Sequence, residues 1–415
     1  MSNTMKQMRA GCGRGGIIAL FAGLLLPVSA FAQNDGPIEI SGEASVVIGT
    51  ADGVLASDAD ARVKLKSSTL LESGLEIGGV LEARVDGDTP EQASTQGRYS
   101  GFAAGGARGV GPMTGDAYLQ GAYAYARGGF GLVSLGRDNG VASELAITSP
   151  TIFRAIGVND WKTDLTGLND VQTVNDFSGY STKLTYMPPA NFLGGILGGL
   201  QLGVSYAPEL ENCGDGLCEP LSPIESDALA AAVVPLTNAT YEDVLETALY
   251  YEKAIGTGDR RMTFGLGASF LTAQGSDLNA TITPSLTDDY EAYSVGVNVA
   301  YGGLTVGGSV KNSNAGLAND EDGYLAFDTG VTYETGKWGF MLGYGAADSD
   351  RLSGSNALLS DFYRETQSAQ AGISYVFDHG VTLGAAAQFV DVTKSDVIGG
   401  DEESAAMMFE SNFKF

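Results

Sequence analysis

Runs of about ten residues in which apolar and polar side chains alternate recur from Ile38 to the end of the chain. Successive side chains of a β-strand point to opposite faces, so this alternation indicates strands with one apolar and one polar face. In the first run, Ile38, Ile40 and Ile48 share a face opposite Glu39 and Glu43. We predict sixteen strands, at about 38–48, 61–68, 75–85, 115–127, 129–138, 177–187, 199–208, 244–254, 261–273, 290–301, 303–312, 323–334, 337–347, 366–378, 380–392 and 404–415.

The connections between these runs alternate in length. Most connections of one set are tight, such as "LESG", "YGG" and "ETGK", whereas the other set includes long polar segments such as 86–114, 139–176 and 209–243. The 59 glycines suit many turns, and no long amphipathic helical pattern occurs. Short turns on one rim and long loops on the other are typical of an antiparallel β-barrel of the bacterial outer membrane.

The polar face of each run argues against a soluble barrel with a filled core. Glutamate, lysine, arginine and glycine occupy that face on strand after strand, so we expect it to line a water-filled lumen while lipid covers the apolar face. Aromatic residues on apolar faces near the short turns favour this placement, since they would form an interfacial girdle. The alternative is an aromatic core of a soluble β-protein. The girdle residues are Tyr186, Tyr251, Tyr301, Tyr333, Trp338 and Phe377.

The first 32 residues have the pattern of a secretory signal peptide. Lys6, Arg9 and Arg14 precede an apolar stretch that ends near Pro27, and a small-residue cleavage site places the cut after Ala32. An uncleaved anchor helix is the alternative. We therefore predict one barrel domain over residues 33–415. Cleavage leaves 20 basic against 50 acidic residues, a net charge of −30, which makes nucleic acid a poor partner.

Few residues offer catalytic or metal chemistry. Cys213 and Cys218 are predicted to form a loop disulfide, because an exported chain meets oxidising conditions and a metal would need more ligands. His379 lies in a tight turn, so we expect no enzyme activity from it. Asp348 and Asp350 are an acidic pair that is either solvated loop charge or a calcium site, and divalent cations could bridge such loops to lipopolysaccharide.

The segment 139–176 is unusually long for a connection without strand alternation, which favours a functional role. It mixes four carboxylates with apolar side chains that an exposed loop would have little use for, so we expect it to fold back against the barrel wall. The carboxylates are Glu144, Asp160, Asp164 and Asp170, and the apolar residues include Ile147, Ile152, Phe153, Ile156, Val158 and Trp161.

The order of these parts resembles the general porins of Gram-negative bacteria, and the acidic, glycine-rich texture is similar to alphaproteobacterial porins. The features that carry the resemblance are "FGLVSLGRDNG" before the long loop, the sixteen-strand layout, the signal peptide and the terminal Phe415. The resemblance implies that the third external loop enters the lumen and that its carboxylates face a basic wall. It assigns Arg137 to that wall at the entrance of the loop, although Arg137 reaches the lumen only if the alternation breaks at Gly136. Strand parity adds four wall candidates, which are Arg62, Lys64, Lys66 and Arg84.

The resemblance further implies a homotrimer in contact with outer-membrane lipid and lipopolysaccharide, with Phe415 read by the barrel-assembly machinery. In the last run, "MMFESNFKF", we expect Met407, Phe409, Phe413 and Phe415 to face lipid and the intervening residues to face the lumen. We expect passive diffusion of small hydrophilic solutes and ions with a preference for cations, because the chain is strongly acidic. A substrate-specific channel and a structural or surface-binding barrel are the alternatives.

Overall fold

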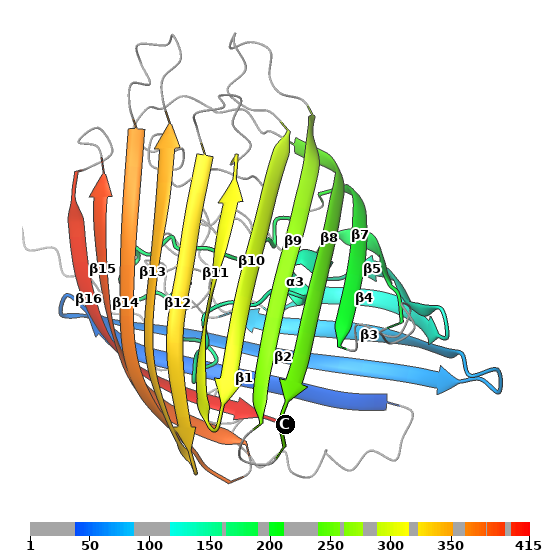
Figure 1. Cartoon of the computed structure of the whole chain (residues 1–415), viewed down its shortest axis with the longest axis horizontal. Coiled ribbons are helices and arrows are strands. Elements are labelled where there is room, and N and C mark those ends of the chain that lie inside the picture. The colour runs from blue at the N-terminus through cyan, green and yellow to red at the C-terminus, as the bar shows by residue number, and fades with distance from the viewer. Residues whose placement is uncertain are drawn as a thin grey trace, which may run out of the picture.

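The computed structural model describes the following residues: 38–86, 117–159, 163–189, 199–210, 240–257, 261–276, 289–314, 323–351, 362–378, 380–394 and 400–415. Within these ranges sixteen antiparallel strands form a closed barrel (Figure 1). The prediction of such a barrel is confirmed. In the same ranges, no helix is long and apolar enough to cross a membrane.

The strands follow one another around the barrel in chain order. They are β1 (Ile38–Ala51), β2 (Val54–Leu70), β3 (Glu76–Asp86), β4 (Ala117–Gly128), β5 (Gly131–Arg137), β6 (Thr182–Met187), β7 (Leu200–Glu209), β8 (Thr240–Ile255), β9 (Met262–Ser276), β10 (Tyr290–Tyr301), β11 (Leu304–Ser313), β12 (Gly323–Thr335), β13 (Trp338–Arg351), β14 (Phe362–Val376), β15 (Val381–Lys394) and β16 (Glu402–Lys414). The short helix α3 (Val141–Glu144) lies between β5 and β6.

The barrel closes where the first strand pairs with the last. The pairing of β1 with β16 runs from Glu43 opposite Lys414 to Ala51 opposite Ala406. Beyond it, Phe415 and Gly42 exchange two backbone hydrogen bonds, at 2.9 and 3.0 Å between nitrogen and oxygen. Because every strand has two neighbours, the barrel leaves no open sheet edge, which a structure surrounded by lipid requires.

Strand β16 shows how the two faces separate. Met407 and Phe409 are 52% and 59% exposed on the outer surface, whereas Met408 and Glu410 are buried on the inner side. On β1, Ile38, Ile40 and Ile48 are likewise exposed outward. The predicted alternation therefore survives folding, with the apolar face turned outward.

The starts of two strands differ most from the sequence prediction. β2 begins at Val54 rather than near residue 61, because Asp52 and Gly53 make a two-residue turn with positive φ angles of 49° and 81°. β6 begins at Thr182, so residues 177–181 belong to the preceding loop. There the Phe177 ring stacks on Tyr290, with centroids 4.2 Å apart, which holds this stretch out of the strand.

Candidate functional site

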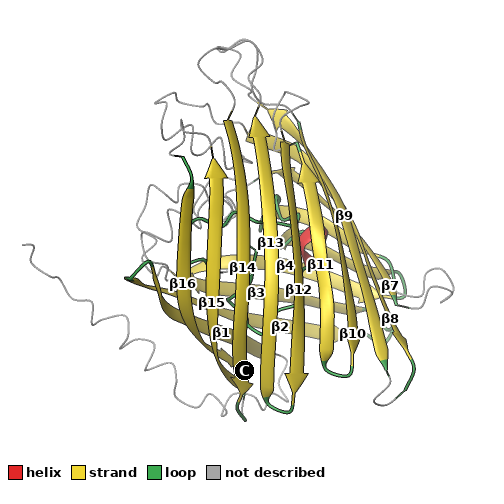
Figure 2. Cartoon of the chain, turned by 60° about the vertical axis from the view of Figure 1, so that its left-hand side comes forward, coloured by secondary structure: helices red, strands yellow, loops and turns green. Residues whose placement is uncertain are grey.

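The segment between β5 and β6, residues 138–181, is called the lumen loop below. Its backbone and side chains bind residues of strands far apart around the barrel. Ala142 N–H donates to Glu246 of β8, at 3.1 Å, and Arg154 reaches Asp60 of β2, at 3.2 Å. A segment that touches opposite sides of a closed barrel must lie inside it, and the strands surround α3 in Figure 2.

The apolar side chains of the lumen loop pack against glycines of the inner wall. A Cβ atom added at these glycines would lie within 3.2 Å of loop atoms, so any other residue would push the loop away. The glycines therefore create the space that the loop occupies. The pairs are Val141 with Gly203, Ile147 with Gly265 and Gly296, Ile152 with Gly339, Val158 with Gly343, Val171 with Gly345, Phe153 with Gly372 and Gly384, and Leu165 with Gly49.

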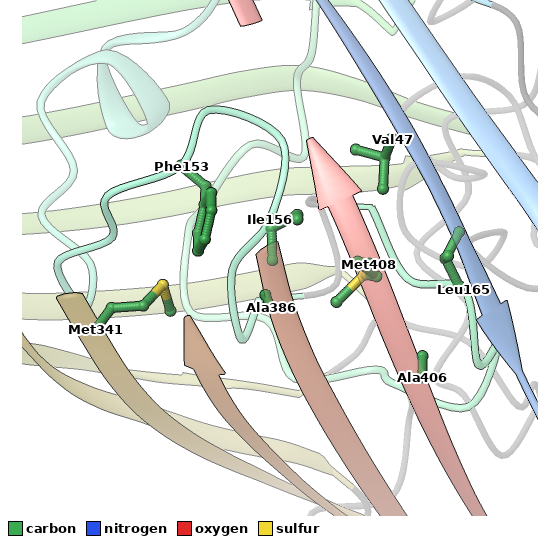
Figure 3. Close-up of a cluster of buried hydrophobic side chains, with 8 residues drawn as sticks. All are labelled: Val47, Phe153, Ile156, Leu165, Met341, Ala386, Ala406 and Met408. Atoms are coloured by element: carbon green, nitrogen blue, oxygen red, sulfur yellow. The ribbon is translucent and has the colours of Figure 1, made fainter. Parts of the chain in front are cut away.

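One apolar cluster joins the lumen loop to the closing strands. Phe153, Ile156 and Leu165 of the loop pack with Val47 of β1 and Met408 of β16, and all are nearly inaccessible (Figure 3). The cluster also includes Met341, Ala386 and Ala406. The apolar content noted in the loop sequence is thus used for contact with the wall.

A buried carboxylate on β12 binds both limbs of the lumen loop. Asp328 accepts hydrogen bonds from Ser149 N–H at 3.0 Å and Thr173 Oγ1 at 2.8 Å, and Asn159 also binds it. The neighbouring Ser309 of β11 donates its hydroxyl to Asp328 at 2.9 Å. Because one carboxylate serves the outgoing and the returning limb, it fixes their separation.

The predicted basic wall lies on the inner face of β2 and β3. Arg62 and Arg84 both pair with Asp60, and Lys64 pairs with Glu82 at 2.9 Å. The side chain of Lys64 is 45% exposed but that of Glu82 only 7%. The charge that these pairs present to the lumen is therefore mainly positive. Lys66 lies nearer the rim of short turns, with Glu39 at 3.9 Å.

Two of the predicted loop carboxylates are enclosed by protein rather than facing open lumen. Asp164 is 1% exposed, and it accepts hydrogen bonds from Thr166 and Asn169 of its own loop. Asp170 is 4% exposed and pairs with Arg364 of β14 at 3.0 Å. Asp160 lies outside the described residues.

Glu144, at the end of α3, is the exposed carboxylate among the predicted loop residues that the structure describes. Although water reaches its side chain, the surrounding protein removes part of its hydration, and this loss together with the charge of Asp138 raises the pKa of Glu144 to about 7. Enclosure also raises the pKa of Asp138, to about 6. The positive charge of Lys64 acts on both carboxylates. Asp138 was not among the predicted residues, although it directly follows Arg137 in "LGRDNG".

The backbone just before Arg137 has an unusual conformation. Gly136 has a φ angle of +137°, where a side chain is strained, and a Cβ there would overlap the carbonyl oxygen of Ala122. Arg137 donates from Nε to the carbonyl oxygen of Tyr180, at 2.8 Å. It therefore ties the entrance of the lumen loop to its exit.

The other predicted sites are only partly covered by the structure. Cys213, Cys218 and His379 lie outside the described residues, so the disulfide stays a prediction. Asp348 is exposed on β13, and the side chain of Asp350 is not described. Among the described residues no group of three or more histidine, cysteine, aspartate or glutamate side chains is placed to hold a metal ion, and calcium binding stays a prediction.

The sequence profile of the Gram-negative porins matches residues 19–395. The chain therefore belongs to this family, and it is an outer-membrane β-barrel channel protein. A search of curated proteins finds no match to the chain.

Several solved structures are similar in fold. OmpF of Salmonella typhi, in complex with daunomycin, shares 16% identity with a TM-score of 0.56, over 91% of this chain and 97% of that one. The trimer form of OmpT from Vibrio cholerae shares 13% identity with a TM-score of 0.53, over 91% and 99%. An anion-selective porin from Comamonas acidovorans shares 14% identity with a TM-score of 0.52, over 91% and 99%. At these identities the likeness concerns the fold.

Proposed function

We propose that this porin allows passive diffusion of small hydrophilic solutes and ions without a chemical reaction, and that its lumen is narrowest between α3 and the β2–β3 wall. The observation that carries this proposal is the opposition of charges there. Asp138 and Glu144 of the lumen loop interact electrostatically with Lys64, and Arg62 lies beside it on the wall.

Opposed charges across a narrow opening produce a transverse field that orients water and dipolar solutes. Apolar solutes would displace that water and pass less readily. Recording from the purified protein in a planar bilayer tests the proposal, with stepwise conductance as the expected result. An absence of conductance from correctly folded protein would favour the alternative of a structural or surface-binding barrel.

A preference for cations is the second part of the proposal. The net charge of the predicted mature chain and the exposed Glu144 support it, whereas the exposed Lys64 opposes it. The similar Comamonas porin is described as anion-selective, so the fold does not determine the preference. The reversal potential in a salt gradient tests its sign, and a preference that weakens at high salt is expected because salt screens the field.

The assembly is the third part. The similar Vibrio OmpT has a trimer form, which supports a homotrimer here. The exposed apolar outer face supports contact with lipid, and the acidic external loops are suited to lipopolysaccharide through divalent cations such as calcium. Phe415, paired with Gly42 beside the closing strands, is suited to recognition by the barrel-assembly machinery before closure. The mass of the native protein in detergent, measured with and without calcium, tests the proposed homotrimer.

Saturation of the solute flux separates simple diffusion from the substrate-specific alternative. A simple pore gives a flux proportional to solute concentration, whereas a dedicated binding site saturates. Liposome swelling at increasing concentrations of neutral sugars would show which applies, and a sharp preference among sugars of equal size would favour the specific channel.

A further inference from the structure

The lumen loop is fixed to the wall at the point where its outgoing limb turns back. Residues 153–156, called the anchor turn below, present three consecutive backbone N–H groups to one carboxylate. Glu410 of β16 accepts from Arg154 through Oε1, at 3.0 Å, and from Ala155 and Ile156 through Oε2, at 3.0 and 3.2 Å. Glu410 is 3% exposed, so these N–H groups replace the water that a buried carboxylate would otherwise need.

Phe153, the first residue of the anchor turn, fills the space beside two glycines on β14 and β15. The ring of Phe153 lies where the side chains of Gly372 in β14 and Gly384 in β15 would be, since a Cβ at either glycine would overlap ring carbons. Phe153 is 5% exposed. The ring and the two glycines therefore fit as a matched pair, and neither side can change its size alone.

Arg154, the second residue of the anchor turn, connects the turn to the strands on the other side of the junction between β16 and β1. The Arg154 guanidinium pairs with Glu43 of β1 at 2.5 Å and with Asp60 of β2 at 3.2 Å. The same Asp60 holds Arg62 and Arg84 of the basic wall, at 3.5 and 2.9 Å. A displacement of the anchor turn would therefore disturb the charges of the basic wall as well as the path of the loop.

We propose that the anchor turn determines the width of the pore and keeps its open-channel conductance constant in time. Glu410, Gly372 and Gly384 are the positioning residues. The inference rests on the proposed function of the barrel as an open channel. The loop runs for many residues between β5 and β6, and a chain of that length held at its ends alone would sample many paths. The anchor turn divides it into two shorter limbs, each tethered at both ends, which restricts how far either limb can move into the lumen.

Single-channel recording on charge-neutral and size variants tests this inference. Glu410→Gln replaces one acceptor oxygen by an amide that donates, so at least one loop N–H loses its partner. We expect a rise in open-channel current noise and additional conductance levels. Gly384→Ala places a methyl group against the Phe153 ring, so the anchor turn must shift into the lumen and the unitary conductance should fall.

The pairing of Gly384 with Phe153 supplies a rescue that a general loss of stability would not show. In the double variant Gly384→Ala, Phe153→Ala, the overlap is gone, and the conductance should return toward that of Phe153→Ala alone. The matched control is Gly79→Ala on β3, where the nearest atom to an added Cβ is the carbonyl oxygen of Tyr123 at 3.6 Å. We expect this control to conduct as the parent protein does.

Folding is checked by the shift in gel mobility between unheated and boiled samples. If Gly384→Ala fails to fold, Glu410→Gln still decides the matter. Unchanged conductance and noise in every variant that folds, beside a conducting parent protein, would overturn the role of the anchor turn and leave the channel function standing. A parent protein that folds but does not conduct would instead remove the proposed function.

Discussion

Arg364 of β14 and Asp170 of the lumen loop form an ion pair that is almost entirely buried, with 3.0 Å between Nε and Oδ2 and side-chain exposures of 2% and 4%. Arg364 also donates from Nη2 to the carbonyl oxygen of Leu168, at 2.9 Å. The planar guanidinium thus binds both a side chain and the backbone of the returning limb. Asp170, which the sequence suggested as a carboxylate of the pore constriction, therefore attaches the lumen loop to the barrel wall.

Removing one partner of this pair should destabilise the protein. Arg364→Met leaves the Asp170 carboxylate buried without its counter-charge, which typically costs about 3–5 kcal/mol. Asp170→Asn should also be destabilising, because it leaves the arginine uncompensated. The double variant should lose less than the sum of the two single losses, as expected for residues that interact directly. Thermal unfolding in detergent, followed by circular dichroism, measures this, and additive losses would contradict the coupling.

Asp328 offers a second test of how the loop is attached. Asp328→Asn replaces an acceptor oxygen by a donor among groups that already donate, so we expect a loss of about 1–3 kcal/mol. The control is the same substitution at Asp391, which is exposed on β15 and should change the free energy of unfolding by less than about 0.5 kcal/mol. Equal losses at both positions would show that the bonds between Asp328 and the loop contribute little to stability.

The exposed carboxylate of Glu144 and the enclosed carboxylate of Asp164 should differ in their effect on ion selectivity. At pH 8, where Glu144 is charged, Glu144→Gln removes an exposed negative charge opposite Lys64, so the reversal potential should shift toward that of an anion-selective pore. Asp164→Asn should leave it nearly unchanged, because the Asp164 carboxylate is enclosed by its own loop, and should lower thermal stability instead. A larger shift in reversal potential from Asp164→Asn would reassign the conducting path.

The strands could be predicted because each run carries its own evidence. Alternation along β16 indicates both that Met407 and Phe409 face outward and that Glu410 faces inward, without knowledge of any other strand. The basic residues of β2 were found in the same way, since parity alone places Arg62 and Lys64 on one face.

The loop carboxylates could not be assigned because their surroundings are tertiary. Nothing near Asp170 in the sequence indicates that the distant Arg364 will pair with it. The role of the inner-wall glycines in making room for the lumen loop was missed for a related reason. Glycine in a strand can signal a turn, a bulge or a close approach, and only the folded loop shows that Gly384 makes room for Phe153. Asp164 had a local signal that could have been used, since Asp-x-Thr is a sequence that favours a side-chain to backbone turn.

Lowering the pH should reverse the charge balance at the narrow region. The pKa values of Asp138 and Glu144 are raised to about 6 and about 7, so both carboxylates are charged at pH 8 and largely neutral at pH 5. The facing groups that act on them are Glu82, Lys64, Lys183 and Glu246. The field near α3 therefore loses its negative side as the pH falls.

In a potassium chloride gradient, the reversal potential should therefore shift toward that of an anion-selective pore as the pH falls from 8 to 5. The same shifts have a consequence for stability. A carboxylate that binds its proton more tightly when folded stabilises the fold at acid pH, and this contribution is lost as the pH rises from about 4 toward 7. The variant Asp138→Asn, Glu144→Gln should show neither effect at these positions. If its reversal potential still follows pH as the parent protein does, other carboxylates control selectivity and the narrow region lies elsewhere in the lumen.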